Sequence, residues 1–191
     1  MKTMQTRNLM ICALFAALIA AGAFIKIPIP VVPFTLQLLF TMLAGLLLGG
    51  KLGAISVGVY ILMGLIGLPV FVEGGGIAYI FKPTFGYLIG FAVASYVTGC
   101  IAHQAALPSF RRLLAANLIG LVIVYALGMS YCYIISRFYL AAPIGLWPLF
   151  LYGFILSAPG DIMLCFLGAM LGKRLIPIIR RQSVSIKENP L

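Results

Sequence analysis

Charged side chains are scarce in this sequence. Only 8% of its 191 residues are charged, three are acidic and one is His, whereas 63% are hydrophobic. A soluble domain carries about a quarter charged residues, so this chain has too few of them to cover a surface in water. The composition predicts an all-α integral membrane protein that forms one compact bundle.

Motifs for metal, redox or nucleotide chemistry are also missing. The four cysteines lie far apart without a C-x-x-C pair, so neither a metal site nor a cofactor is expected. The stretch GLLLGGKL (45–52) nearly spells a P-loop, but Leu52 replaces the final Ser or Thr and the stretch ends an apolar run. No zinc motif or nucleophile elbow occurs. We therefore expect no enzyme activity, and active uptake would need a partner that supplies energy.

The net charge of +10 reflects membrane topology rather than nucleic-acid binding, because the basic residues occur in short segments between apolar runs. A helix needs about 17–25 apolar residues to cross a bilayer. Six runs meet or approach this length: about 8–25, 34–50, 53–71, 84–103, 113–136 and 147–172.

The distribution of Lys and Arg predicts the orientation of these spans. With a cytoplasmic N-terminus, ten of the 13 basic residues face the cytoplasm, and three, Lys26, Lys82 and Arg137, face outward. Cytoplasmic loops carry the excess of basic residues, so both termini are predicted to be cytoplasmic. The expected organisation is a six-transmembrane-helix bundle over residues 1–175, followed by a basic cytoplasmic tail, 176–191.

A cleaved signal peptide is the competing interpretation of the N-terminus. Residues 1–23 have a basic start, an apolar core and a final Ala21-Gly22-Ala23. The apolar run is slightly long for a signal core, which favours a retained first span. Five remaining spans would still leave the C-terminus inside.

Two irregular segments interrupt the apolar pattern on the predicted outer side. KIPIPVVPFTLQ (26–37) holds three prolines, which make it stiff and non-helical. VEGGGIAYIFKPTFGYLIGF (72–91) combines three consecutive glycines with many aromatic rings. Surface hairpins are the ordinary interpretation, but small-molecule pockets combine apolar rings with a few polar groups. An external cavity is therefore predicted, with these polar candidates: Thr35, Gln37, Tyr79, Lys82, Thr84 and Tyr87.

Asp161 lies within the sixth apolar run, where an ionisable residue is a functional candidate by default. Helical spacing gives its face three further members: Phe154, Ser157 and Cys165. Three roles are open: an ion pair with Lys82 or Arg137, a proton relay, or an acceptor for a substrate N–H group. The spans hold no second acid or His within them, which disfavours the relay.

The first span carries small residues at helical spacing. Ala13, Ala17 and Ala21 are four residues apart, with Ala16 and Ala20 beside them. Such faces allow close helix approach. Packing within the bundle and docking of a partner are both open.

These motifs resemble the BioY family, the biotin-specific S components of energy-coupling factor (ECF) transporters. The matching stretches are ALFAALIAAGAFIKIPIPVVPFTLQ (13–37), GGGIAYIFKPTFGYLIGF (74–91) and PGD (159–161), and the likeness covers residues 8–175.

The resemblance implies a six-helix protein of the bacterial plasma membrane that captures biotin from outside. It also implies docking on a transmembrane coupling subunit that two ATPases drive. Transferred to this chain, the docking face becomes Ala13, Ala16, Ala17, Ala20 and Ala21. The biotin site becomes Thr35, Gln37, Gly75, Tyr79, Tyr87 and Asp161.

The chain departs from the family three residues after the acid, where many members have Lys and this sequence has Leu164. Lys82 is the expected substitute as a polar contact, and it would face the carboxylate of biotin. Three alternatives stay open: an S component for another small vitamin such as thiamine or riboflavin, a non-catalytic membrane assembly subunit, and a membrane-embedded transferase.

Overall fold

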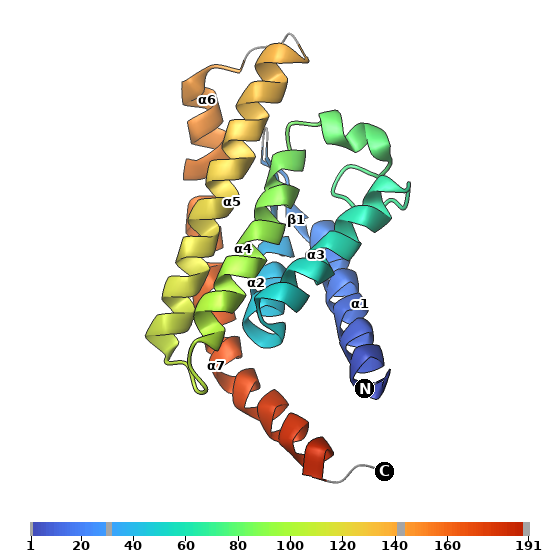
Figure 1. Cartoon of the computed structure of the whole chain (residues 1–191). Helices are drawn as coiled ribbons and strands as arrows, with labels where there is room; N and C mark the ends of the chain where they lie inside the picture. Colours follow the sequence, from blue (N-terminus) through green and yellow to red (C-terminus); the bar gives the residue numbers. More distant parts are fainter. Residues whose placement is uncertain (1, 30–31, 141–143, 189–191) are drawn as a thin grey trace.

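The protein is a bundle of helices (Figure 1). This computed structural model describes residues 2–29, 32–140 and 144–188. Within these ranges, helix occurs in each of the six expected apolar runs. The first five runs form α1 (Lys2–Phe24), α2 (Gln37–Leu48), α3 (Gly50–Leu65), α4 (Phe85–His103) and α5 (Phe110–Phe138). The sixth run forms α6 (Leu146–Phe150), the π-helical turn η2 (Leu151–Ile155) and α7 (Ala158–Glu188).

Several helices are suited to a membrane. Among the described residues, four helical stretches are long and apolar enough to cross one, with mean hydropathies of 1.6 to 2.1: Thr6–Phe24, Phe85–His103, Phe110–Phe138 and Leu146–Ile179. The other two, α2 and α3, are shorter, at 12 and 16 residues. Large apolar side chains such as Val122 and Met163 point outward from α5 and α7 and are 67% and 65% exposed. Lipid tails solvate such side chains and water does not, so this surface fits a membrane protein.

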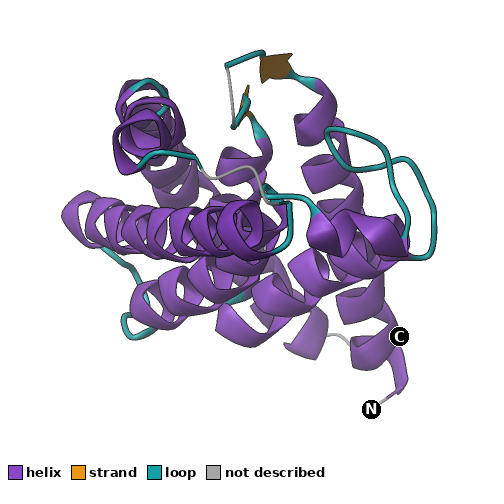
Figure 2. Cartoon of the chain, turned by 90° about the horizontal axis from the view of Figure 1, so that it is seen from above, coloured by secondary structure: helices purple, strands orange, loops and turns teal. Residues whose placement is uncertain are grey.

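The two ends of the bundle differ. The first turns of α1 and the last turns of α7 lie at one end, together with the α2–α3 and α4–α5 connections (Figure 1). Toward the other end lie a small hairpin and the 3-10 helix η1 (Ile77–Phe81). We call these the terminal end and the hairpin end. Seen from above, the hairpin lies at the rim of the bundle (Figure 2).

Close backbone contacts join α2, α3 and α4 near the terminal end. A Cβ atom on Gly45 would lie 2.4 Å from the Ser95 carbonyl oxygen, and one on Gly99 would lie 2.4 Å from the Gly50 nitrogen. The chain turns from α2 into α3 at Gly49, whose φ of 86° favours glycine. These glycines allow two short helices to pack directly on α4.

The third helix ends earlier than its sequence predicts. The expected span was 53–71, but α3 ends at Leu65, so the prediction for residues 66–71 is wrong. Gly67 has a φ of 110° and Pro69 follows, which together stop the helix although the segment is apolar. The Gly76 N–H then donates to the Gly64 carbonyl at 2.7 Å and holds the following segment against the end of α3.

The described part of the proline-rich segment before α2, residues 26–29 and 32–36, is non-helical, as expected, and it contains two short paired strands. Strand β1 (Lys26–Ile27) pairs antiparallel with β2 (Phe34–Thr35), with Lys26 opposite Thr35. The Leu36 N–H donates to the Ile25 carbonyl at 3.2 Å and closes the base of this strand pair. The two strands were not predicted, because the prolines indicate only that a helix is excluded.

The sixth run is broken just before Asp161. Asp161 lies near the middle of the helical stretch Leu146–Ile179, as the sequence predicts. A π-helical turn and a second turn precede it, so Asp161 also lies in the first turn of α7. Pro159 has no N–H to donate to a preceding carbonyl, which favours a new helix start here. At its other end α7 continues to Glu188, through position 176 where the tail was expected to begin. Residues 189–191 of that tail lie outside the described residues.

Candidate functional site

A cavity opens at the hairpin end, between the hairpin, residues 72–84 and helices α4, α5 and α7. The space within it amounts to about 690 Å³, a volume that includes open solvent at its mouth. Five of the seven predicted ligand-binding residues line it: Thr35, Gln37, Tyr79, Tyr87 and Asp161. The remaining lining residues are Val32, Pro33, Phe34, Leu38, Val72, Glu73, Thr84, Leu88, Phe91, Val124, Tyr125 and Ser157.

Two polar groups of the broken sixth run line this cavity. The Tyr125 hydroxyl donates a hydrogen bond to Oδ2 of Asp161. Among the described residues, no hydrogen bond reaches the other carboxylate oxygen of Asp161, and the buried hydroxyl of Ser157 has no partner. Buried polar groups are normally hydrogen-bonded, so these atoms have capacity for a ligand.

The ion-pair role considered for Asp161 has no support in the described residues. Lys82 pairs with Glu73 at 2.8 Å. Arg137 instead donates to the Tyr133 hydroxyl at 2.6 Å. Asp161 is thus held by a neutral tyrosine and not by a cation, which leaves its charge available to hydrogen-bond donors of a bound molecule.

Tyr87 and Tyr125 are aromatic lining residues of the cavity, and Phe154 packs against Tyr125 without lining it. The Phe154 ring meets the Tyr125 ring edge-on, with centroids 4.9 Å apart. Tyr87 approaches Tyr125 in the same manner at 6.4 Å, and its hydroxyl donates to the Gly153 carbonyl at 3.4 Å. Buried rings give a flat apolar surface that can pack a fused ring system.

A chain of hydrogen bonds fixes the polar groups under the hairpin. The Thr35 hydroxyl donates to Oε1 of Gln37 at 3.3 Å, and Nε2 of Gln37 donates to the Tyr60 hydroxyl at 2.7 Å. Tyr60 in turn donates to the Val70 carbonyl at 3.2 Å. Gln37 is only 2% exposed. The chain therefore locks the Gln37 amide in one orientation beside the cavity.

Tyr79 and Gly75 have different roles in the glycine–aromatic segment. The centroids of the Tyr79 and Phe71 rings are 4.4 Å apart, and Tyr79 lines the cavity. Burial raises the pKa of the Tyr79 hydroxyl above its ordinary value, so the group stays protonated. Gly75 does not line the cavity. A Cβ atom there would lie 2.2 Å from the Leu68 carbonyl oxygen, so Gly75 allows the segment to fold closely onto itself.

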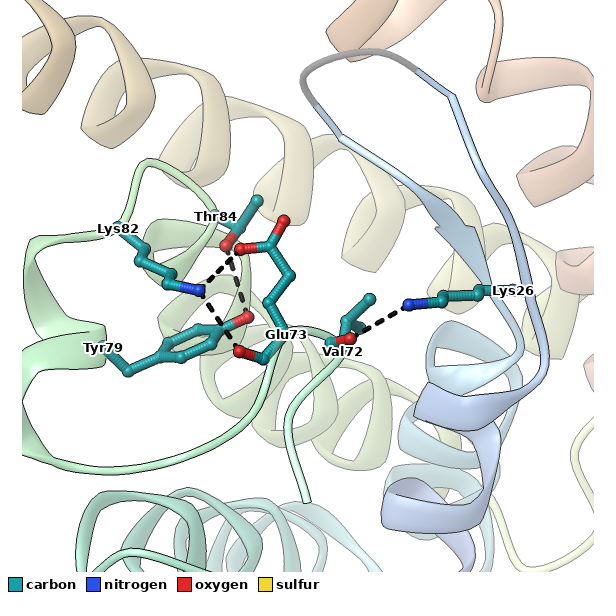
Figure 3. A network of polar contacts seen from close by, with 6 residues as sticks. All are labelled: Lys26, Val72, Glu73, Tyr79, Lys82 and Thr84. Atoms are coloured by element: carbon teal, nitrogen blue, oxygen red, sulfur yellow. Dashed lines mark hydrogen bonds and ion pairs between the residues drawn. The ribbon is translucent and has the colours of Figure 1, made fainter. Parts of the chain in front are cut away.

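Lysines surround the mouth without lining the cavity. Lys82 donates to the Glu73 carboxylate and to the Glu73 carbonyl, and Lys26 donates to the Val72 carbonyl at 3.1 Å (Figure 3). Nζ of Lys82 also lies 5.0 Å from the centre of the Tyr79 ring. Lys82 therefore lies near the entrance, where it contacts the lining residue Glu73 without lining the cavity itself.

The alanines of α1 divide into two groups. Ala16 and Ala20 are buried in the bundle, at 0% and 9% exposure. Ala13, Ala17 and Ala21 are exposed. Only the second group is available to a partner, because the first already packs against the rest of the chain.

A second groove runs between α5 and the α6–α7 region, and its chemistry differs from that of the first. Apolar side chains such as Leu118, Val122 and Ile162 line most of it. Asp161 and Ser157 are not among its lining residues. A ligand with several hydrogen-bonding groups therefore fits the first cavity better.

The sequence did not indicate Tyr125, Glu73 or Tyr60 as parts of the site. A hydroxyl in the middle of the apolar fifth run was a usable signal for Tyr125, but nothing in the spacing relates it to Asp161. Leu164, the position where the resemblance led us to expect Lys, is buried in the apolar core at 3% exposure. The side chain there adds no polar contact to the cavity.

Comparison with known proteins places this chain among relatives. The model of the BioY family matches residues 1–181. The chain belongs to the BioY family. It is 47% identical over 180 residues to a probable biotin transporter BioY of Lysinibacillus sphaericus, covering 94% of this chain and 92% of that one. It is 44% identical over 124 residues to the biotin transporter BioY of Thermotoga maritima, covering 64% of this chain and 72% of the other.

The fold also matches a solved structure of the same kind. The crystal structure of the S-component for biotin from an ECF-type ABC transporter superimposes with a TM-score of 0.78 and 29% identity. The match covers 92% of this chain and 93% of that one. BioY-family members are transporter components and not enzymes.

Proposed function

We propose that this chain is a biotin-binding S component, which captures biotin at the outer face of a bacterial plasma membrane for an ECF uptake transporter. The observation that carries the proposal is the Asp161–Tyr125 pair, which leaves one carboxylate oxygen uncommitted in an aromatic cavity. The names of the relatives and of the matching crystal structure support the same ligand.

Biotin has the chemical groups that this cavity can satisfy. Its ureido ring offers two N–H donors and a carbonyl acceptor, and Asp161 accepts from the donors. The Ser157 hydroxyl, also without a partner among the described residues, is a second candidate contact. The thiophane ring and the aliphatic chain of biotin are apolar, so they are suited to packing against Tyr87 and Tyr79. The predicted site thus combines polar groups with aromatic rings: Thr35, Gln37, Tyr79, Tyr87 and Asp161.

The carboxylate of biotin points toward the mouth in this proposal. Lys82 lies there, with its ammonium group beside Tyr79. We propose that Lys82 replaces the lysine that the family resemblance led us to expect at the position of Leu164. Gly75 contributes by shaping the segment that carries Tyr79 rather than by touching the ligand.

Membrane topology is a further part of the proposal. Residues 1–175 cross the membrane six times, both termini are cytoplasmic, and residues 176–191 form a basic tail in which α7 continues. The 10-to-3 distribution of basic residues supports this orientation. Reporters fused before Asn8 and after Lys187 test it, and external accessibility of either would contradict it.

Ala13, Ala17 and Ala21 form the proposed contact with a transmembrane coupling subunit, which ATPase subunits energise. Exposed small residues allow a partner helix to approach closely. Ala17→Trp should leave biotin binding intact and abolish co-purification with the coupling subunit. Ile119→Trp, at an exposed position of α5, is the control. Undiminished complex formation by the Ala17 variant would contradict the contact.

The ligand is tested by equilibrium titration of the purified chain in detergent with biotin, thiamine and riboflavin. Saturable binding of biotin alone is the expected result. Saturable binding of thiamine or riboflavin instead would assign the chain to another vitamin. Absence of any saturable ligand would favour an assembly subunit and overturn the proposal.

A further inference from the structure

Residues 72 and 73 are held between two lysines at the mouth of the cavity (Figure 3). Lys82 donates to Oε2 of Glu73 at 2.8 Å and to its carbonyl oxygen at 3.2 Å. From the hairpin, Lys26 donates to the Val72 carbonyl at 3.1 Å. Glu73 and Val72 line the cavity, whereas neither lysine does. Glu73 is thus a cavity-lining residue whose carboxylate already holds the ammonium group of Lys82.

The Lys82–Glu73 ion pair is easily exchanged. The side chains are 39% and 48% exposed, and exposed pairs contribute little because water competes for both charges. Lys82 has a second support that does not depend on Glu73, since its ammonium lies 5.0 Å from the centre of the Tyr79 ring. Tyr79 is buried and accepts a hydrogen bond from Thr84 at 3.4 Å. Lys82 therefore keeps a position at the mouth when Glu73 moves away.

We propose that Glu73 occupies Lys82 in place of a ligand carboxylate, and that the carboxylate of the ligand displaces it during binding. This inference rests on the proposed function, because biotin ends in a carboxylate. Two carboxylates cannot share one ammonium group without repelling each other, so Glu73 competes with an anionic tail. A neutral tail leaves the pair intact. Glu73 is therefore a specificity-determining residue that sets how strongly the site prefers an anionic ligand.

The test compares two ligands on matched variants by equilibrium titration in detergent. The ligands are biotin and biotinol, in which an alcohol replaces the carboxylate. The variants are Glu73→Gln, Lys82→Gln, the double variant and Lys51→Gln. Lys51 is an exposed lysine near the start of α3, at the terminal end, and it serves as the control.

Glu73→Gln should tighten biotin binding by about 1.5- to 5-fold, the range that an exposed charge pair covers, and leave biotinol binding unchanged. Lys82→Gln should weaken biotin and reduce the difference between the two ligands. In the Lys82→Gln background, Glu73→Gln should have no further effect, because Glu73 acts through Lys82. Lys51→Gln should bind both ligands as the parent does.

Unchanged or weaker biotin binding by Glu73→Gln would overturn the inference while leaving the proposed function in place. An equal change for biotin and biotinol would overturn it too, because a general effect on the mouth is not competition for a charge. A parent protein that binds neither ligand would overturn the proposed function and the inference together.

Discussion

Two groups of glycines in this bundle have different uses. Near the terminal end, Gly45, Gly50, Gly53 and Gly99 lie against backbone atoms of neighbouring helices. Near the hairpin end, Gly64 and Gly128 lie against the rings of Phe71 and Tyr87 instead, at 2.0 and 2.5 Å from an added Cβ. The first use brings helices together, and the second makes a recess for a ring beside the cavity.

The difference between these two groups of glycines distinguishes residues that stabilise the fold from residues that shape the cavity. A backbone contact cannot adjust without moving a whole helix, whereas a ring can shift within its recess. Substitutions at the terminal end should therefore lower stability, and substitutions at the hairpin end should chiefly lower affinity for biotin.

The largest expected effect is that of Gly45→Ala. The new Cβ would lie 2.4 Å from the Ser95 carbonyl oxygen, so α2 and α4 must separate. We expect a loss of about 3 kcal/mol in the free energy of unfolding, at the upper end of overpacking costs. Thermal unfolding in detergent measures it. Gly58→Ala, with nothing within 4 Å of the added Cβ, is the matched control. An equal loss of stability in the two variants would contradict the role of Gly45 in helix packing.

Asp161→Ala should show the opposite pattern, with weaker biotin binding and a small change in stability. Losing a charge-assisted hydrogen bond to the ureido nitrogens costs about 1.5–3 kcal/mol, or about 10- to 150-fold in affinity. Biotin titration of monodisperse protein measures it, with expression recorded beside it. Asp161→Asn should also weaken binding, because it adds donors that oppose the ureido N–H groups. Affinity within about twofold of the parent would leave Asp161 a structural residue.

Gly128→Ala adds the same methyl group at a glycine that lies against a ring instead of a backbone atom. Its Cβ would meet the Tyr87 ring at 2.5 Å and push that ring toward the cavity. We expect affinity for biotin to fall by about 1–2 kcal/mol, with a smaller loss of stability than in Gly45→Ala. Titration and unfolding of the two alanine variants side by side provide the measurement. A Gly128 variant that loses stability but binds normally would contradict a role of the recess in the site.

Tyr60→Phe should give the smallest effect. It removes the hydroxyl that accepts from the Gln37 amide at 2.7 Å and frees that amide to rotate. One neutral hydrogen bond contributes about 0.5–1.5 kcal/mol, so biotin affinity should fall by a few-fold. Titration of the variant checks this, and Tyr96→Phe, at an exposed tyrosine of α4, is the control. Unchanged affinity would mean that Thr35 and the backbone suffice to orient Gln37.

The amino-acid sequence was sufficient to predict a helical membrane protein and its family. Six apolar runs report helices because lipid requires each backbone group to bond within its own segment. Sequence also selected Asp161 as a candidate, because a carboxylate within an apolar run is costly, and the structure places it in the lining of the cavity. Proline content excluded a helix over the hairpin, but it did not determine strand pairing, which depends on where both ends of the segment are anchored.

Contacts between distant residues could be read only from the packing of the helices. Tyr125 reaches Asp161 across 36 positions of sequence, and Gln37 reaches Tyr60 across 23. Sequence spacing relates residues on one helix, whereas these contacts depend on how different helices pack. The same reason explains why Gly45 and Gly128, alike in sequence, differ in role: an added Cβ meets a backbone atom at one and an aromatic ring at the other.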